Sequence, residues 1–368
     1  MFDRRLVQNF DWLLLGWVSL ILALGIVNLY SAGYARQPGE TAPVYLKQIY
    51  WLGVGLALMF LMLLYDYRHL EKIAYPLYFL SLALLLAVMV GGKTVSGSRR
   101  WLSLGPMAFQ PAELTKIAII LVLARYFNRR PHAAPLGLKD LLAPLAIVSA
   151  PVLLIVKQPD LGSGILLVLV ATSIILFVGV RLRMLVMGAI GLVLAAPMVW
   201  PFLKDYQRRR VLTFLDPEKD PLGAGYHILQ SKIAVGSGQF WGKGFLQGTQ
   251  SQLQFLPEQH TDFVFSVFAE EWGFVGSAFL VMLFMGLTLW GLQVARDCKE
   301  RFGHLLALGV TALMFWQVFI NLCMVTGLMP VVGIPLPLFS YGGSSLITTL
   351  LGVGILLNIR MRRFLFQG

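Results

Sequence analysis

Five acidic residues lie within or at the edges of long apolar segments of this 368-residue chain. They are Glu113, Asp160, Asp262, Glu270 and Glu271. A carboxylate that is moved out of water into a membrane costs free energy, and such residues usually serve a function. These five acids are therefore the first candidates for chemistry.

Asp262 is the sharpest candidate, because it closes a long polar segment just before an apolar run that begins at Phe263. Two interpretations are open from the residues alone. Asp262 could cap the following helix with its side-chain oxygen, which is the somewhat more common role at such a position. It could instead act as a general base on a hydroxyl group, since a carboxylate at a membrane–water boundary near many cations suits that work.

Glu113 and Lys116 share one face of a predicted helix, because residues three apart are neighbours on a helix surface. Pro111 stands just before them, as is typical of a helix start. The two residues form either a local ion pair, with Glu113 favoured by the helix dipole, or a polar patch that lines a cavity. The sequence favours neither interpretation over the other.

The other three candidate acids and one histidine can also be assigned roles from their positions. Asp160 follows Gln-Pro and precedes Leu-Gly-Ser, which predicts a helix cap more than direct chemistry. His260 stands just before the Asp262 position and is more often a structural hydrogen-bonding group than a ligand. Glu270 lies about 80° around a helix from Asp262 and could assist it, whereas Glu271 must face another helix.

Several cations in segments that we assign to the outer membrane face are candidates for binding a diphosphate. They are Arg99, Arg100, Arg208, Arg209 and Arg210. Arginine offers paired hydrogen bonds to phosphate oxygens, although these residues could also be solvated charges that interact with anionic headgroups. Arg208 and Arg210 point to the same side only if the chain between them is extended.

Other chemistries have no support in the sequence. No Gly-x-Ser-x-Gly, Walker A or His-Glu-x-x-His motif occurs, so serine hydrolysis, nucleotide hydrolysis and zinc proteolysis lack a motif. The two cysteines, Cys298 and Cys323, form neither a metal-spaced set nor a disulfide framework. The net charge of +12 suggests a nucleic-acid binder until its distribution is examined.

The composition indicates the environment of these residues. Hydrophobic residues make up 57% of the chain and charged residues only 13%, against about 25% charged in a soluble domain. This excludes an ordinary cytosolic enzyme and a disordered chain. Ten apolar stretches are long enough to cross a hydrocarbon core of about 30 Å, which predicts an all-α polytopic membrane protein. The stretches are residues 11–31, 46–64, 73–90, 113–127, 139–157, 161–180, 184–203, 263–295, 304–328 and 340–359.

Positive charges cluster in alternate short segments between these stretches, for example at Arg129 and Arg130 and at Arg362 and Arg363. Cytoplasmic segments of membrane proteins carry such an excess of Lys and Arg. The pattern places both termini in the cytoplasm and accounts for most of the basic charge, which argues against nucleic-acid binding. We expect one integral membrane domain over residues 1–368, with a protease-site remnant at 365–368.

Two segments interrupt the apolar pattern. Residues 204–262 form a loop of about sixty residues between the seventh and eighth stretches, and long ordered loops are usually functional. Residues 226–235 within it predict a short amphipathic helix, and we expect the whole loop on the outer, periplasmic face. Residues 91–112 form a second, irregular segment on the same face.

The loop and its neighbouring motifs closely resemble the SEDS family (shape, elongation, division and sporulation). In the loop the resemblance rests on Leu215-Asp216-Pro217, Asp220 to His227, Gln230-Ser231-Lys232, Gly248 to Gln252, Leu256-Pro257-Glu258 and His260 to Phe263. Elsewhere it rests on Arg100-Trp101, Phe109-Gln110-Pro111 with Glu113 and Lys116, Gln158 to Gly162, Pro330 to Pro337 and Ser340 to Ser344. Residues 249–255 favour the elongation branch of the family over its division branch.

The resemblance implies a peptidoglycan glycosyltransferase of the bacterial cytoplasmic (inner) membrane. Members of the family join lipid II units into glycan strands, with undecaprenyl diphosphate as the leaving group, and work with a class B penicillin-binding protein that cross-links the strands. By similarity Asp262 is the catalytic residue, and a divalent cation (Mg or Mn) could share the charge of the diphosphate. The substrate-binding candidates are then Glu113, Lys116, Arg100, Arg208, Arg210, Asp160, His260 and Glu270.

Two other functions compete with this interpretation. A flippase or transporter of the lipid-linked precursor would use the same polar cavity and cations, but it needs its polar groups at the bilayer midplane. A noncatalytic scaffold for the partner protein would gain nothing from Asp262 and the cations around it. The position of Asp262 at the end of the loop favours the polymerase.

Overall fold

The computed structural model describes residues 8–34, 43–95, 98–104, 107–130, 135–199, 201, 205–216, 223–256 and 258–363. The predicted protease-site remnant and the motif residues 217, 220–222 and 257 lie outside these residues. The described elements are α2 (Trp12–Ala32), α3 (Val44–Leu64), α4 (His69–Gly91), β1 (Lys93–Val95), β2 (Ser98–Leu104), β3 (Met107–Phe109), α5 (Pro111–Asn128), α6 (Leu138–Lys157), α7 (Leu161–Val178), α8 (Leu182–Val199), α9 (Asp205–Leu215), α10 (Ala224–Ser237), α11 (Thr249–Gln252), α12 (Val264–Asp297), α13 (Arg301–Val325) and α14 (Gly343–Arg362).

Long apolar helices confirm the predicted all-α polytopic membrane fold. Among the described residues, eight helices are long and apolar enough to cross a membrane, and they coincide with eight of the predicted stretches. They are α2, α3, α4, α6, α7, α12, α13 and α14. The other two stretches also form helices, α5 and α8, of 18 residues each. The count of ten crossings stays a prediction.

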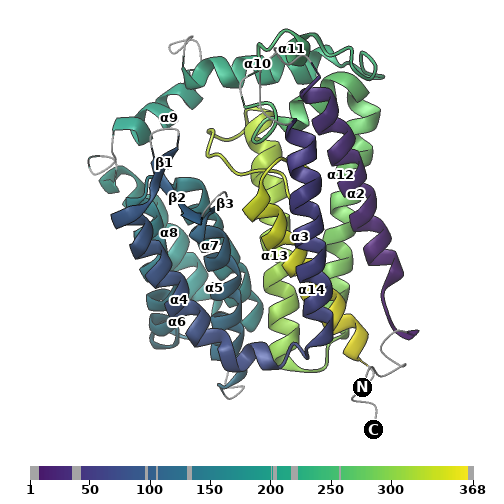
Figure 1. The fold of residues 1–368 in the computed structure, drawn as a ribbon. Helices are drawn as coiled ribbons and strands as arrows, with labels where there is room; N and C mark the ends of the chain where they lie inside the picture. Colours follow the sequence, from purple (N-terminus) through teal and green to yellow (C-terminus); the bar gives the residue numbers. More distant parts are fainter. Residues whose placement is uncertain are drawn as a thin grey trace.

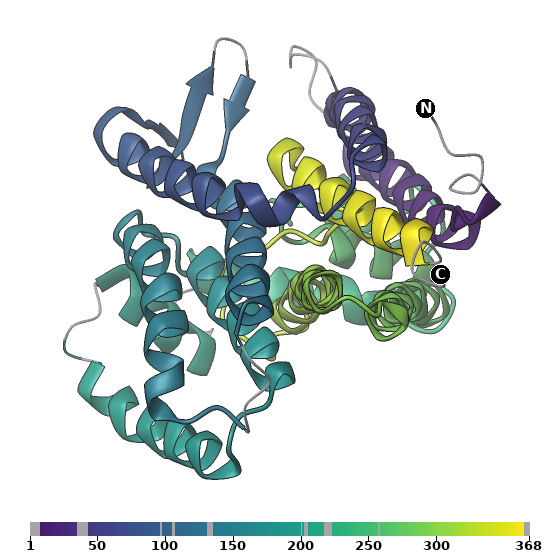
Figure 2. The same ribbon diagram turned by 90° about the horizontal axis from the view of Figure 1, so that it is seen from below.

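The helices form two groups that stand side by side (Figure 1). One group holds α4 to α8, and the other holds α2, α3, α12, α13 and α14. Figure 2 shows the same groups from below, with α2, α3 and α14 (purple to yellow) close together. α5 and α7 join the groups by packing against α13. α5 is buried on all sides from Ala118 to Ala124, as expected for an apolar helix that other helices surround.

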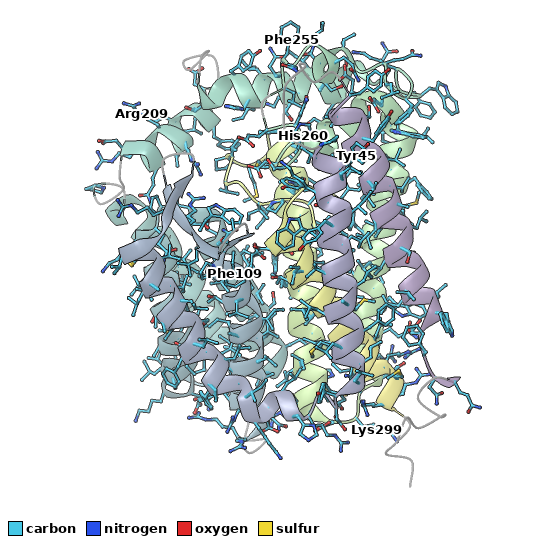
Figure 3. All side chains as sticks on the ribbon, in the orientation of Figure 1. Tyr45, Phe109, Arg209, Phe255, His260 and Lys299 are labelled. Atoms are coloured by element: carbon cyan, nitrogen blue, oxygen red, sulfur yellow. The ribbon has the colours of Figure 1, made fainter. Side chains whose placement is uncertain are left out.

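The two ends of the bundle differ in structure and charge. α9, α10 and α11 lie across one end, which we call the loop end (Figure 1). The opposite end, which we call the basic end, holds Arg360 in the last turn of α14. Arg360 forms ion pairs with Asp11 at the start of α2, at 3.4 Å, and with Asp297 at the end of α12. Figure 3 shows His260 towards the loop end and Lys299 at the basic end. The start of α2 and the end of α14 thus share one side of the bundle, as an even number of crossings requires.

The segment expected to be irregular, residues 91–112, instead contains a small antiparallel sheet. Its strand order is β1-β2-β3, and Leu102 of β2 lies opposite Phe109 of β3. The sheet lies at the loop end of the first helix group, where β2 contacts α4 and α5. The prediction of irregular structure was wrong because strands of three to seven residues are too short to show a clear alternation of polarity.

α12 is broken at Gly273, where φ is 63°. The glycine-rich segment 238–244 inserts its backbone into the break. Two N–H groups of this segment bond to the carbonyls before the break, and two of its carbonyls accept bonds from the N–H groups after it. The N–H groups of Lys243 and Gly244 donate to the carbonyls of Glu270 and Glu271, both at 3.0 Å. The N–H groups of Phe274 and Val275 donate to the carbonyls of Gln239 (2.8 Å) and Phe240 (3.2 Å). Two backbone groups on each side of the break are therefore bonded, which lowers the cost of a break within a bundle.

Gly273→Ala is expected to destabilise the protein, because an alanine is strained at this positive φ and its Cβ would lie 2.2 Å from the Gly242 nitrogen. We expect a loss of at least about 2 kcal/mol, measured as a lower midpoint of thermal unfolding in detergent. Gly236→Ala is the matched control, since a Cβ at Gly236 meets no atom within 4 Å. Equal midpoints for the two variants would show that the break tolerates a side chain.

Candidate active site

Asp262 lies at the loop end, directly before α12. The N-cap residue of α12 is Phe263, and no side chain caps this helix, so the interpretation of Asp262 as a helix cap is wrong. The half-buried carboxylate instead lies against Gly333, because a Cβ built on Gly333 would stand 3.4 Å from Asp262 Oδ2. Gly333 also has a φ of 75°, a backbone conformation that favours glycine, so this wall of the site carries no side chain.

The charge state of Asp262 is shifted by its surroundings. The pKa of Asp262 is raised from 3.8 to about 6, and burial is the largest cause. The negative charges of Glu258 and Asp160 also act to raise this pKa, whereas the positive charges of Arg210 and Arg100 act to lower it. The carboxylate is therefore a stronger base than a solvated aspartate, and two cations lie near enough to act on it.

The Ser-Tyr-Gly-Gly-Ser run before α14 holds the chain next to Asp262. The Tyr341 N–H donates to the His260 carbonyl at 2.8 Å, and the Ser340 hydroxyl donates to the Thr261 carbonyl at 2.6 Å. Buried Gln48 of α3 donates to the Ser340 carbonyl at 3.0 Å and so ties this run to a membrane helix. The run thus acts through hydrogen bonds on the segment that carries the candidate base.

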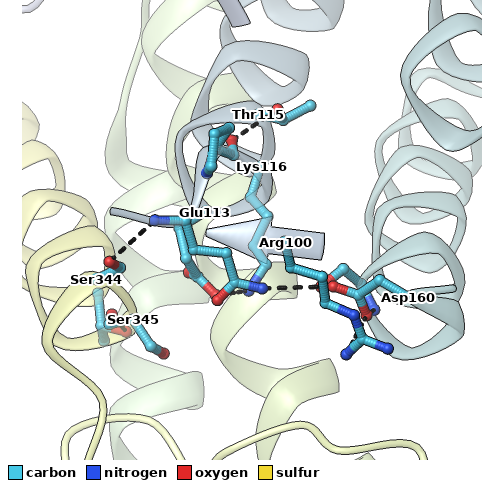
Figure 4. A network of polar contacts seen from close by, with 11 residues as sticks. Arg100, Glu113, Thr115, Lys116, Asp160, Ser344 and Ser345 are labelled. Carbon is cyan, nitrogen blue, oxygen red and sulfur yellow. Dashed lines mark hydrogen bonds and ion pairs between the residues drawn. The ribbon is translucent and has the colours of Figure 1, made fainter. Parts of the chain in front are cut away.

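A second polar network surrounds Asp160 at the start of α7. Asp160 caps this helix, as predicted, with Oδ1 accepting from the Ser163 N–H at 3.2 Å. Arg100 of β2 lies 3.8 Å from the same carboxylate, and Gln110 donates to its other oxygen at 3.4 Å. Figure 4 shows Arg100 and Asp160 beside Glu113 and Lys116. Asp160 therefore combines a structural cap with the positioning of an arginine.

Glu113 and Lys116 form an ion pair at the start of α5, with Lys116 Nζ 2.6 Å from Glu113 Oε1. Pro111 occupies the first turn of the helix, as predicted. The residues are only 3% and 2% exposed, so the pair is far from a solvated surface contact. The backbone N–H of Gln110 donates to the Ser344 hydroxyl at 3.3 Å and joins this site to α14. The predicted local ion pair exists, and it is buried among the helices.

The start of α7, which carries Asp160, packs against the segment that borders Asp262. A Cβ built on Gly162 would stand 2.5 Å from the Val332 carbonyl, so the start of α7 packs directly on the 330–337 segment. Gly333 of this segment contacts the Asp262 carboxylate. The chain thus brings Asp160 and Asp262 to one region of the loop end.

Arg208 and Arg210 belong to the helix α9. The two side chains were expected to point to the same side only in an extended chain. On a helix, residues two apart point in directions about 200° apart, so Arg208 and Arg210 do not share a side. Arg208 donates to the Pro201 carbonyl at 2.6 Å, while Arg210 is the one whose charge lowers the pKa of Asp262. Of the two, Arg210 is the cation that the structure brings to Asp262.

Glu270 is fully buried and anchors the long loop to α12. Its Oε1 accepts from Lys243 Nζ at 2.6 Å, the Thr249 hydroxyl at 3.1 Å and the Gln250 N–H at 3.0 Å. These partners all belong to the loop. Glu271, in contrast, accepts from the Ser31 hydroxyl of α2, which confirms that it faces another helix.

Two site residues escaped the sequence analysis: Gln48 and Asn321. Each is a buried polar side chain that bonds to the backbone of the segments around Asp262. A single amide within an apolar helix was the available signal, because such groups need partners. Among the described residues, no group of three or more His, Cys, Asp or Glu side chains could hold a metal ion, so no step is assigned to the predicted divalent cation.

The sequence from residue 11 to residue 364 matches the FtsW/RodA/SpoVE family, which is described as "Cell cycle protein". The chain belongs to this family. The predicted resemblance to the SEDS family is thus confirmed. The Escherichia coli K12 protein named "Peptidoglycan glycosyltransferase MrdB" is 44% identical over 347 residues, which cover 94% of this chain and 93% of that protein. A "Probable peptidoglycan glycosyltransferase FtsW" of Geobacter sulfurreducens is 36% identical over 364 residues, 97% of this chain and 96% of its own.

Solved structures of family members share the fold. Thermus thermophilus rod shape determining protein RodA is 34% identical, with a TM-score of 0.72 over 96% of this chain and 98% of its own. A chain from the structure described as "Structural coordination of polymerization and crosslinking by a peptidoglycan synthase complex" is 39% identical, with a TM-score of 0.83 over 96% of this chain and 98% of its own. The family fold therefore extends over nearly the whole chain.

Lys243→Ala is expected to destabilise the protein by about 3 kcal/mol, because it leaves the buried Glu270 carboxylate without its cation. The double variant Lys243→Ala with Glu270→Gln should recover part of this loss, which thermal unfolding of the parent, the two single variants and the double variant would measure. Arg129→Ala is the control, since its pair with Glu71 is largely exposed and should contribute under about 1 kcal/mol. Additive effects at Lys243 and Glu270 would contradict the anchor.

Proposed function

We propose that this chain is a peptidoglycan glycosyltransferase that polymerises lipid II during cell elongation. The observation that carries the proposal is the Asp262 carboxylate, which is half-buried, anchored through its backbone and close to two arginines. A raised pKa and nearby cations suit a base that works beside an anionic leaving group. Relatives named as peptidoglycan glycosyltransferases, with up to 44% identity over nearly the full chain, support the same reaction.

The reaction joins an acceptor sugar hydroxyl to a donor sugar that is α-linked to a polyprenyl diphosphate. The product has a β linkage, so one displacement with inversion is the simplest route and needs one base. In this route Asp262 takes the proton of the acceptor hydroxyl as the hydroxyl oxygen attacks the donor carbon. With a pKa near 6, most of the Asp262 carboxylate is ionised at neutral pH and ready to accept the proton.

The leaving diphosphate gains negative charge as the sugar–oxygen bond breaks, and fixed cations stabilise such charge. Arg100 and Arg210 are the cations that act on Asp262, and Lys116 lies beside the Arg100 network. Glu113 orients Lys116, and Asp160 orients Arg100. We assign binding of the diphosphate to these three cations and leave Arg208 and His260 as candidates for contacts with the sugars. Glu270, which the sequence suggested for substrate binding, is fully buried and anchors the loop instead.

The apolar helices fit a substrate with a long prenyl tail, which would lie along them in the lipid. We place the protein in the bacterial inner membrane, with the loop end in the periplasm, on the strength of its basic opposite end. A class B penicillin-binding protein is the proposed partner. The related chain from a synthase complex that coordinates polymerization and crosslinking supports this pairing.

The basic end favours a polymerase over a transporter of the same lipid. Glu300, at the turn between α12 and α13, accepts from Tyr67 at 2.6 Å and pairs with Arg68 at 3.1 Å. Both partners belong to the turn between α3 and α4, and Arg301 adds a bond to the Arg130 carbonyl at 2.9 Å. A transporter must open at each end in turn. Polar bonds that tie the basic end together suit an enzyme that works only at the loop end.

Asp262→Asn is expected to lower the rate of polymerisation by at least about 1,000-fold, because the amide keeps the shape of the carboxylate but cannot accept the proton. The measurement uses purified protein with its transpeptidase partner and labelled lipid II. Glu258→Gln is the matched control, because it also changes an acid near Asp262 to an amide and should keep most of the rate. Full-rate polymerisation by Asp262→Asn would remove Asp262 from the mechanism.

The rate of polymerisation is expected to rise with pH through a limb near pH 6, because only the ionised Asp262 is a base and its pKa is about 6. Glu258→Gln should move this limb to lower pH, since the negative charge of Glu258 raises the pKa of Asp262. A pH–rate profile of both proteins tests the assignment. A limb near pH 4, or no shift in the variant, would mean that another group sets the profile.

A further inference from the structure

Asn321 of α13 is a fully buried polar residue that the reaction scheme above does not use. Its side-chain nitrogen donates to the Asp262 carbonyl at 2.9 Å and to the Ile334 carbonyl at 2.8 Å. Two carbonyl acceptors determine which way the amide faces, because its own oxygen would repel both of them. Both N–H groups of Asn321 are therefore committed to the backbone around the candidate base.

This bond completes a row of three. The carbonyls of His260, Thr261 and Asp262 each accept a hydrogen bond, from the Tyr341 N–H, the Ser340 hydroxyl and Asn321 respectively. Because peptide units are planar, fixing three carbonyls in succession fixes the backbone between them and the direction in which the Asp262 side chain leaves it. Asn321 supplies the bond closest to that side chain.

The second bond of Asn321 acts on the segment that lies against the carboxylate. Ile334 directly follows Gly333, whose α-carbon faces Asp262 Oδ2. One amide thus holds both the backbone that carries the carboxylate and the wall against which the carboxylate rests. Loss of this amide would free both segments at once. The Ser340 hydroxyl makes a second link of this kind, since it donates to the Thr261 carbonyl at 2.6 Å and accepts from the Leu336 N–H at 2.8 Å.

We propose that Asn321 is a positioning residue, which sets the place and the dehydration of the Asp262 carboxylate by clamping its backbone to the 330–337 segment. The inference rests on the proposed function. Asn321 touches no reacting atom in this scheme and acts only through Asp262. Its loss should therefore change the chemistry of Asp262 more than the binding of lipid II.

The test compares Asn321→Ala with Asn358→Ala. Asn358 of α14 is also fully buried and also donates to two backbone carbonyls, those of Met62 and Tyr65, but it lies at the basic end. Both variants should unfold at lower temperature than the parent. Only Asn321→Ala should lower kcat for lipid II polymerisation, by at least about tenfold, with KM changed less than about threefold.

The pH–rate profile separates positioning from general stability. In Asn321→Ala the acid limb should move down from about 6 towards the ordinary value of 3.8, since a carboxylate released into water loses the effect of burial. Asn321→Ser keeps one hydrogen-bond donor, so the pH of its acid limb should lie between those of the parent and Asn321→Ala. Asn321→Ser replaces Asn321→Ala in the test if the alanine variant does not fold. The Asn358→Ala profile should match the parent.

The outcomes distinguish this inference from the proposed function. If Asn321→Ala and Asn358→Ala lose kcat equally and keep the parent acid limb, Asn321 is a structural residue and the inference is overturned. If Asp262→Asn polymerises at the parent rate, the proposed base itself fails. If Asp262→Asn is inactive and the acid limb of Asn321→Ala or Asn321→Ser is shifted to lower pH, the result supports both the proposed function and the role of Asn321.

Discussion

A catalytic base at the edge of a membrane must be fixed in position and partly shielded from water. In this protein both conditions depend on hydrogen bonds to backbone carbonyls. The carbonyls of residues 260–262 accept bonds from α13 and from the run before α14, so elements far apart in sequence converge on three peptide units. A free loop would turn the carboxylate of Asp262 into water, where burial would no longer raise its pKa. The cations and glycines of the loop end are arranged around this anchored segment.

The long loop stays ordered because it is built into a membrane helix. Its segment 238–244 supplies the hydrogen bonds that the broken α12 needs at Gly273, and Glu270 next to the break binds Lys243 and Thr249 of the loop. The helix and the loop depend on each other. Without the loop, the helix ends at the break would lack hydrogen-bond partners, and without the helix, the loop would lack a fixed point of attachment. The broken helix and the loop therefore stabilise each other, and the segment before α12 inherits that rigidity.

The membrane helices could be predicted because apolar runs of this length have one stable solution in lipid. Candidate acids could be found because acids are rare in such runs. The role of Asp262 could not be resolved from the residues alone. Asp262 would be the N-cap if α12 began at residue 263 but not if it began at residue 264, and a helix end cannot be predicted to within one or two residues. Asn321 escaped because its two partners, residues 262 and 334, become neighbours only in the folded chain.

The Glu113–Lys116 pair extends the argument from the base to the leaving group. A buried ion pair is weak evidence for stability, because removing both charges from water costs about as much as their attraction returns. Glu113 Oε2 also has no hydrogen-bond partner among the described residues, so the pair is not even fully satisfied. Its value then lies in where it places Lys116, which is inside the bundle and beside the Arg100–Asp160 network. A basic side chain fixed in that place suits an anionic diphosphate that is drawn out of water.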